Sequence, residues 1–373
     1  MKETTMRRVT GDPWAGTPTG THGGRDGEER VTFDERHATQ TLADAQRKQP
    51  ARGLVGRDHD QDRNMVARAV MSAPSLHNAQ PWLLRVRPDR VELYRDTSRA
   101  LPLIDPHGRE ATISCGAALF GIRLAVAMQG HQAVVPLLPD PDTPSHLATV
   151  LAGPPYEASA EEEHLFEVMP RRRWHPGPFV PREVPDHVTA ELETAVRAED
   201  AWVRDVRSTA QREALTGLTN RAAEVLARGR AYRDEVATWN RRVPVGRGVP
   251  GVRRDGAAEH PPAPGLWRTR LVRPDTVDGD PHRDLLLVVG ARSDDPRGWL
   301  AAGQALHRLL LAATARGLVA STLTQVVEVP RLREALASAL RLPGAPQFVV
   351  RVGYPTSEVP SPPVRSAADV VLG

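Results

Sequence analysis

The stretch GAALFGIRLAVAMQG, residues 116–130, is apolar on nearly every side when it is read as a helix, and it ends at a glycine. A helix without a polar face is buried inside a large core. A second stretch, GQALHRLLLAATARG at 303–317, shares six identities in fifteen positions with it and needs no gap. We therefore expect two copies of one long buried helix in this chain.

The similarity between the two copies extends upstream of these helices. DPHG at 105–108 matches DPRG at 295–298, and ARAV…WLLRV at 67–86 matches ETAV…WVRDV at 193–206. Two Ala- and Leu-rich helices can resemble each other through composition alone, but agreement of order across three segments favours a duplication. Each half is then predicted to read helix, strand, long buried helix, strand. Two copies are too few for a solenoid.

Other local patterns predict further elements around this frame. PWLLRVRPDRVELYRD at 81–96 alternates like a β-hairpin, and LLLVVGA at 285–291 and APQFVVRVGYP at 345–355 are typical of strands. The region 208–242 is periodic enough to predict one long helical stretch. Residues 243–283 are rich in Pro, Gly and Arg, and we expect a lid-like segment over about 226–283.

One insert distinguishes the two copies. Between the AV pair and the tryptophan, the first copy has MSAPSLHNAQP at 71–81 and the second has only RAEDA at 197–201. Ser75, Asn78 and Gln80 in this insert both donate and accept hydrogen bonds. Such groups suit a heterocycle with alternating C=O and N–H groups, or a phosphate. The alternative is a Ser/Asn turn that binds nothing.

A basic motif lies in the second copy. MPRRRWHPGPFVPREVP at 169–185 contains Arg171, Arg172 and Arg173 in succession. The arginine fork matches phosphate, although an exposed basic turn is the alternative. GRGVPG at 246–251 follows no strand and opens no helix, so it fails the context of a dinucleotide-binding loop.

Composition excludes several classes of protein. The formal net charge of the 373-residue chain is +3 and no basic patch is interleaved with aromatics, so we expect no nucleic-acid partner. No apolar stretch approaches a membrane span, and no secretory signal is present, so we expect no membrane association. The single cysteine, Cys115, predicts core packing and a cytoplasmic location. Polar, Gly-rich residues 1–61 predict a mostly disordered extension, followed by halves at 62–165 and 166–373.

The set APSLHNAQPW, RRR, RVGYP and the terminal PPVRSAADVV resembles the FMN-dependent nitroreductase family, and in particular its fused-dimer, Acg-type branch of NAD(P)H nitroreductases. The resemblance covers roughly 62–373. It implies an α+β fold of nitroreductase type, with two pseudo-symmetric halves fused in one chain, each a mixed β-sheet with long buried helices. The basic motif and the PSLHNAQPW motif then come from opposite halves.

The resemblance also implies which residues contact FMN. The basic motif implies phosphate and ribityl contacts from Arg171, Arg172 and Arg173, although its last basic position falls at His175 or Pro176 here. Contacts with the flavin from the opposite half are implied for Ser75, Asn78 and Gln80. A backbone N–H near flavin N5 is implied for Leu323 or Thr324 in ASTLTQ, and a contact near the phosphate for Arg365.

The function implied is that of an FMN oxidoreductase that passes a hydride from NADPH or NADH to an electron-poor small molecule. No catalytic side chain is required, because the flavin carries the redox chemistry. One intact motif pair predicts one FMN, and the fused halves are compatible with a monomer. Two alternatives stay open: a non-catalytic FMN-binding or storage protein with the flavin covered by the lid, and a structural or partner-binding protein that has lost flavin.

Overall fold

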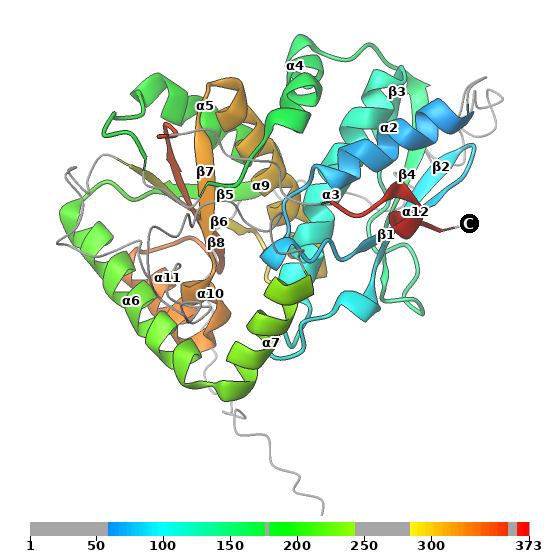
Figure 1. Ribbon diagram of the computed structural model, residues 1–373. Coiled ribbons are helices and arrows are strands. Elements are labelled where there is room, and N and C mark those ends of the chain that lie inside the picture. The colour runs from blue at the N-terminus through cyan, green and yellow to red at the C-terminus, as the bar shows by residue number, and fades with distance from the viewer. Residues whose placement is uncertain (1–58, 176–178, 243–283, 357–363, 373) are drawn as a thin grey trace, which may run out of the picture. The chain divides into compact units, whose positions relative to one another are not determined.

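The structure, a computed structural model, describes residues 59–175, 179–242, 284–356 and 364–372, all within the unit that begins at Pro50. These described residues form two sheets, with the strand orders β3-β4-β2-β1-β9 and β5-β6-β8-β7. Two long helices, α3 and α9, lie side by side between them (Figure 1). The predicted extension and most of the predicted lid-like segment lie outside the described residues.

The first half is built around the predicted hairpin, which is confirmed by the antiparallel pairing of Trp82 with Arg95 and of Val86 with Val91. Strand β4 and helix α4, which the sequence analysis missed, complete this half. Its elements are α2 (His59–Met71), η1 (Leu76–Asn78), β1 (Trp82–Val86), β2 (Arg90–Arg95), η2 (Thr97–Arg99), α3 (Arg109–Met128), β3 (His131–Val134), β4 (His146–Pro155) and α4 (Ala160–Val168).

The second half follows the short turn η3 (Met169–Arg171). The helical stretch predicted at 208–242 is present as two helices, because Gly229 has an extended backbone (φ −73°, ψ 104°) and glycine is a poor helix former, so the chain breaks there. The elements are α5 (Asp186–Arg197), β5 (Ala201–Asp205), α6 (Thr209–Arg228), α7 (Arg230–Arg242), β6 (Leu285–Ala291), α9 (Pro296–Ala315), β7 (Val319–Leu323), α10 (Gln325–Glu328), α11 (Pro330–Ala339), β8 (Pro346–Gly353), α12 (Ala367–Val370) and β9 (Val371–Leu372).

The crossing of α3 and α9 depends on one glycine in each helix. A Cβ at Gly116 would run into the backbone oxygen of Leu300, and a Cβ at Gly303 into that of Ile113. Gly303 and Leu300 occupy the positions of Gly116 and Ile113 in the second copy of the repeat. The contact is therefore reciprocal, as in a two-fold interface, which is consistent with the predicted duplication.

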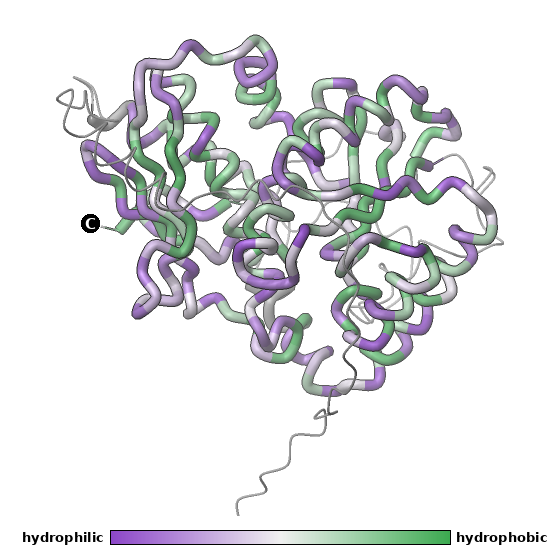
Figure 2. Tube along the Cα trace, turned by 180° about the vertical axis from the view of Figure 1, so that it is seen from behind, coloured by the Kyte–Doolittle hydropathy of each residue, from purple (hydrophilic) through white to green (hydrophobic). Residues whose placement is uncertain are grey.

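Helix α3 is long and apolar enough to cross a membrane by length and composition alone, so the expectation that no stretch approaches that length is wrong. Its burial explains the composition differently. Of the apolar window, 83% is buried inside the protein, between α2 and α9. Figure 2 shows the same division along the chain, with hydrophobic residues in the inner strands and hydrophilic residues at the outer turns.

The C-terminal end crosses from the second half to the first. Strand β9 pairs in parallel with β1, with Leu84 opposite Val371. The short helix α12 before it begins with a capping box made by Ser366 and Asp369. This crossing brings Arg365, which directly precedes the cap, to the start of β1.

Candidate functional site

The insert that distinguishes the two copies has a strained backbone. His77, Asn78 and Gln80 have φ values of 50°, 54° and 48°, and they account for three of the six non-glycine residues with positive φ in the described chain. Left-handed backbone is costly for these residues and persists where the surroundings enforce it. Such concentrated strain in one loop is a mark of functional sites.

Two serines hold this loop in place. The Ser75 hydroxyl accepts a hydrogen bond from the Gln80 backbone N–H (3.0 Å), which closes the loop on itself. The Ser114 hydroxyl, on α3, accepts one from the Leu76 N–H (3.3 Å). Cys115 is fully buried beneath the loop with its Sγ 3.2 Å from the Pro81 oxygen, and burial raises its pKa, as fits a core residue.

Arg365 clamps the end of the same loop. Its backbone N–H donates to Gln80 Oε1 (2.9 Å), and its guanidinium donates to the backbone oxygens of Gln80 (2.9 Å) and Trp82 (3.0 Å). The guanidinium also pairs with Asp96 at 3.3 Å. The structure thus brings Arg365 and Gln80 together, and the N–H groups of Arg365 donate to protein groups. Its predicted contact near a phosphate stays a prediction.

Only one arginine of the basic motif turns inward. Arg172 is 9% exposed, and its Nε donates to the backbone oxygen of Ser72 at 2.9 Å. Arg171 is exposed, and Arg173 donates to the backbone oxygens of Pro170 and Arg172. The motif and the insert, which belong to different halves, therefore meet at Arg172.

The Arg172 guanidinium has no acidic partner among the residues that the structure describes. Burial, and then the neighbouring charge of Arg173, lower its pKa to about 10. A buried cation without a counter-charge is costly, so such a group is rare in a protein without a bound anion. This position is the best candidate for an anion site.

His307 on α9 lies close enough to Arg172 to feel its charge. The imidazole is 0% exposed, and burial first and Arg172 second lower its pKa to about 3, so it is neutral. Its Nδ1 donates to the Ala117 oxygen (2.7 Å), because a carbonyl can only accept. Nε2 is then an acceptor, and it has no partner in the described part of the chain. Sequence reasoning missed His307, although it replaces Phe120 in the aligned repeat.

The predicted N5 contacts lie where β7 ends. Leu323 is the last residue of β7 and Thr324 caps α10. The Thr324 hydroxyl donates to Glu328 Oε1 (2.5 Å), and Tyr232 on α7 donates to Glu328 Oε2 (2.9 Å). Tyr232 packs in the cluster that contains Leu76 and Ala79. Helix α7 thus links the end of β7 with the strained loop.

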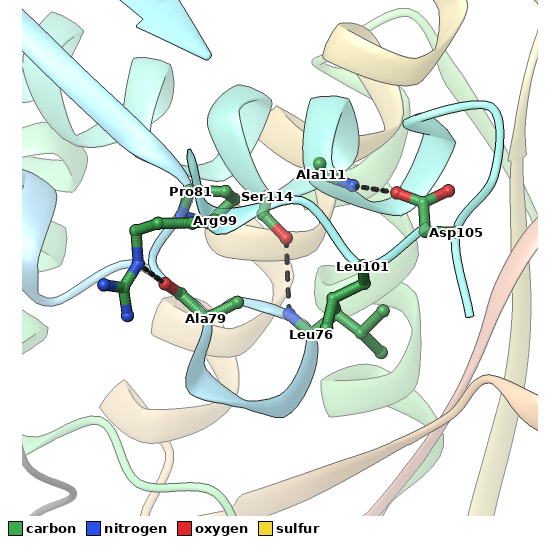
Figure 3. Close-up of a pocket in the computed structure, with 8 residues that line it drawn as sticks. All are labelled: Leu76, Ala79, Pro81, Arg99, Leu101, Asp105, Ala111 and Ser114. Carbon is green, nitrogen blue, oxygen red and sulfur yellow. Dashed lines mark hydrogen bonds between the residues drawn. The ribbon is translucent and has the colours of Figure 1, made fainter. Parts of the chain in front are cut away.

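A small pocket lies under the loop, between it and the first turn of α3 (Figure 3). Its volume is about 10 Å³, enough for one water and far below what a flavin ring requires. Figure 3 shows how it is closed: Ser114 holds Leu76, Asp105 accepts from the Ala111 N–H, and Arg99 donates to the Ala79 oxygen. This pocket supports the loop and does not itself hold a flavin.

A buried acid, which the sequence analysis also missed, lies at the same end of α3. Glu110 is paired with Arg109, which also donates to the Gln347 side chain (2.9 Å) and to the Val327 oxygen (3.2 Å) in the second half. Burial raises the pKa of Glu110 to about 7; Arg109 opposes that rise and nearby carboxylates add to it. The two halves are therefore joined by a titratable pair.

No family model matches the chain. Two relatives from Mycobacterium tuberculosis carry the class name NAD(P)H nitroreductase. "Putative NAD(P)H nitroreductase Rv3131" is 32% identical over 308 residues, 81% of this chain and 88% of the relative. "Putative NAD(P)H nitroreductase acg" is 31% identical over 295 residues, 78% of this chain and 88% of the relative.

The chain belongs to this family of nitroreductases, as the resemblance predicted, and the predicted α+β nitroreductase-type fold is confirmed with it. Among solved structures, an FMN-bound nitroreductase from Bacteroides fragilis is similar with a TM-score of 0.35 and 14% identity, over 54% of this chain and 95% of its own. That likeness is too distant for residue positions to be transferred.

Proposed function

We propose that this protein binds one FMN and acts as an NAD(P)H-dependent oxidoreductase of nitroreductase type. The observation that carries the proposal is the Arg172 guanidinium, buried beside the strained loop without an acidic partner among the described residues. A phosphate monoester offers the charge and the acceptor oxygens that this group lacks. The motifs' resemblance to FMN-dependent nitroreductases supports the same ligand, and the relatives' name, NAD(P)H nitroreductase, supports the nicotinamide donor.

The residues of the site divide into those that hold the ligand and those that hold the loop. Arg172 would bind the phosphate, and Asn78, half-buried at a left-handed position, would offer its amide to the edge of the ring. Ser75 and Arg365 act through Gln80 by fixing the loop. Leu323 and Thr324, where β7 ends and α10 begins, would bring a backbone N–H to the ring from the other half.

When bound, FMN supplies hydride transfer from NADPH or NADH to an electron-poor small molecule. The chain orients the ring, excludes water from one side and supplies the phosphate counter-charge. No side chain has to form a covalent bond with the acceptor. We further propose a cytoplasmic, monomeric protein, since the fused halves already provide the interface between α3 and α9, and light scattering of the purified chain tests the monomer.

A second candidate, FMN storage without turnover, is favoured by the way α7 covers the loop. Glu235 accepts hydrogen bonds from the backbone N–H groups of Leu103 (3.1 Å) and Ile104 (2.8 Å), and Val236 is buried against Leu101 and Ala79. A helix held by such contacts limits access of a nicotinamide to the site.

One spectroscopic experiment separates these functions. The purified chain is titrated with FMN and then mixed anaerobically with NADPH or NADH. Loss of the flavin absorbance within seconds supports the oxidoreductase. Flavin that only dithionite reduces supports storage, and a chain that takes up no FMN excludes both.

A further inference from the structure

The duplication gives the Arg172 site a counterpart on the other side of the α3–α9 crossing. In the aligned repeat the end of α2 corresponds to the end of α5, so Ser72 and Ala73 correspond to Ala198 and Glu199. His307, beside Arg172, likewise corresponds to Phe120. The counterpart should therefore lie near Phe120 and the end of α5.

Two arginines lie at that counterpart position, whereas the Arg172 site has one. The guanidinium carbons of Arg123 on α3 and Arg308 on α9 lie 5.6 Å and 5.9 Å from the centroid of the Phe120 ring. Phe120 itself contacts the ring of His307 at 5.8 Å between centroids. The two basic positions are thus arranged on either side of one aromatic contact at the helix crossing.

Unlike Arg172, these arginines have an acid between them. The carboxylate of Glu199, whose side chain is 3% exposed, accepts from Arg308 through Oε1 (3.0 Å) and from Arg123 through Oε2. Burial lowers the pKa of Arg308, but its hydrogen bonds with Glu161 and Glu199 outweigh burial and leave that pKa raised. One buried carboxylate bound by two guanidinium groups has the electrostatics of a bound anion.

We propose that Glu199 is an internal anion that closes a second, latent phosphate site, formed by Arg123 and Arg308 and equivalent to the Arg172 site. The proposal rests on the proposed function, because it takes Arg172 as the open site of the pair. The short connector 197–201, which lacks the polar insert, supplies Glu199. The latent site therefore suits inorganic phosphate or a similar tetrahedral anion and offers no wall for a flavin ring.

The test compares variants with inorganic phosphate as the probe, against chloride at equal ionic strength. Arg172→Ala removes the open site. Glu199→Gln in that background removes the internal anion and keeps the volume. We expect phosphate to raise the Tm of the double variant, Arg172→Ala with Glu199→Gln, by about 3 °C more than it raises the Tm of Arg172→Ala alone. Adding Arg123→Ala should abolish the gain. Glu161→Gln, an Arg308 partner whose side chain is 59% exposed, is the control in the same background and should gain nothing.

The results separate this inference from the proposed function. The latent site is overturned if phosphate raises the Tm of Arg172→Ala by the same amount with and without Glu199→Gln. Glu199→Ala, which frees more space, must then also show no additional rise in Tm. If the effect of phosphate or FMN is the same in the wild type and in Arg172→Ala, the result instead overturns the assignment of Arg172 as the open phosphate site. If Glu199→Gln unfolds at low phosphate, recovery of the fold by phosphate but not by chloride supports the latent site, and no recovery counts against it.

Discussion

Arg172 donates its Nε hydrogen to the backbone oxygen of Ser72, 2.9 Å away and one hundred residues earlier in the chain. This bond joins the basic motif of one half to the helix that leads into the strained loop of the other. The rest of the guanidinium is left without an acidic partner in the described chain. The proposed FMN site is then divided between the two predicted halves, with its cationic end at Arg172.

Replacing Arg172 should weaken FMN binding with little effect on the fold. We expect Arg172→Met to raise the Kd for FMN about tenfold to a hundredfold, because a charge-assisted hydrogen bond to phosphate contributes about 1.5–3 kcal/mol. The flavin-free protein should lose less than about 1 kcal/mol, since removal of an unpaired buried charge offsets the lost hydrogen bond. Fluorescence titration measures the first effect and urea unfolding the second. Arg171→Met, an exposed control, should bind normally; an equal loss in both variants would contradict the assignment.

Asn78 allows its side chain and its backbone to be tested separately. Its φ of 54° suits glycine, whereas alanine at this φ lowers the free energy of unfolding by about 1 kcal/mol. We expect Asn78→Gly to keep the stability of the flavin-free protein but to bind FMN more weakly, and Asn78→Ala to lose both. The two variants are compared by urea unfolding and FMN titration. Wild-type affinity in Asn78→Gly would show that the amide does not touch the ligand.

The clamp made by Arg365 should be measurable as coupling with Asp96. We expect Arg365→Ala to lower the free energy of unfolding by about 3 kcal/mol, because the buried Asp96 keeps its hydrogen bonds with Ser98 but loses its cationic partner. Asp96→Asn together with Arg365→Ala should cost less than the sum of the single changes. Arg87→Ala, at an exposed position, serves as the control. Strict additivity would rule the clamp out.

Glu110 should make stability depend on pH in a direction opposite to most carboxylates. Its pKa is raised from about 4.5 to about 7 in the folded protein, so the folded state binds the proton more tightly than the unfolded state. The stabilisation is complete below about pH 4.5 and is lost as the pH rises towards 7, by about 3 kcal/mol in total. Glu110→Gln should therefore gain stability over the wild type as the pH rises. Urea unfolding across this range tests it, and a difference between the two that does not change with pH would refute the assignment.

The glycine at the helix crossing should tolerate no side chain. We expect Gly303→Ala to cost about 3 kcal/mol, since the new Cβ meets the Ile113 backbone oxygen, which cannot move without shifting α3. Gly217→Ala in α6, where no described atom lies within 4 Å of the added Cβ, should instead gain up to about 1 kcal/mol from helix propensity. Thermal unfolding compares the two, and a neutral Gly303→Ala would mean that the helices are farther apart.

Local patterns were enough to predict much of this architecture. The hairpin and the long apolar helices follow from periodicities and turn residues that lie within a few positions of each other. The helix break at Gly229 was missed because a single glycine is tolerated in many helices and only packing decides whether the chain bends. Short elements such as α10, α12 and β9 carry too few residues for a clear period.

The candidate site shows more sharply the same contrast between what local sequence predicts and what packing decides. The sequence contains the residue types and the motif pair that predict a flavin site. It also shows that the second copy lacks the polar insert. Three adjacent arginines look alike in sequence, however, and only the fold buries Arg172 and leaves Arg171 in solvent. The roles of Glu110, Glu199 and His307 were likewise decided by tertiary structure. Burial and charge pairing depend on segments that are distant along the chain, and no local pattern records them.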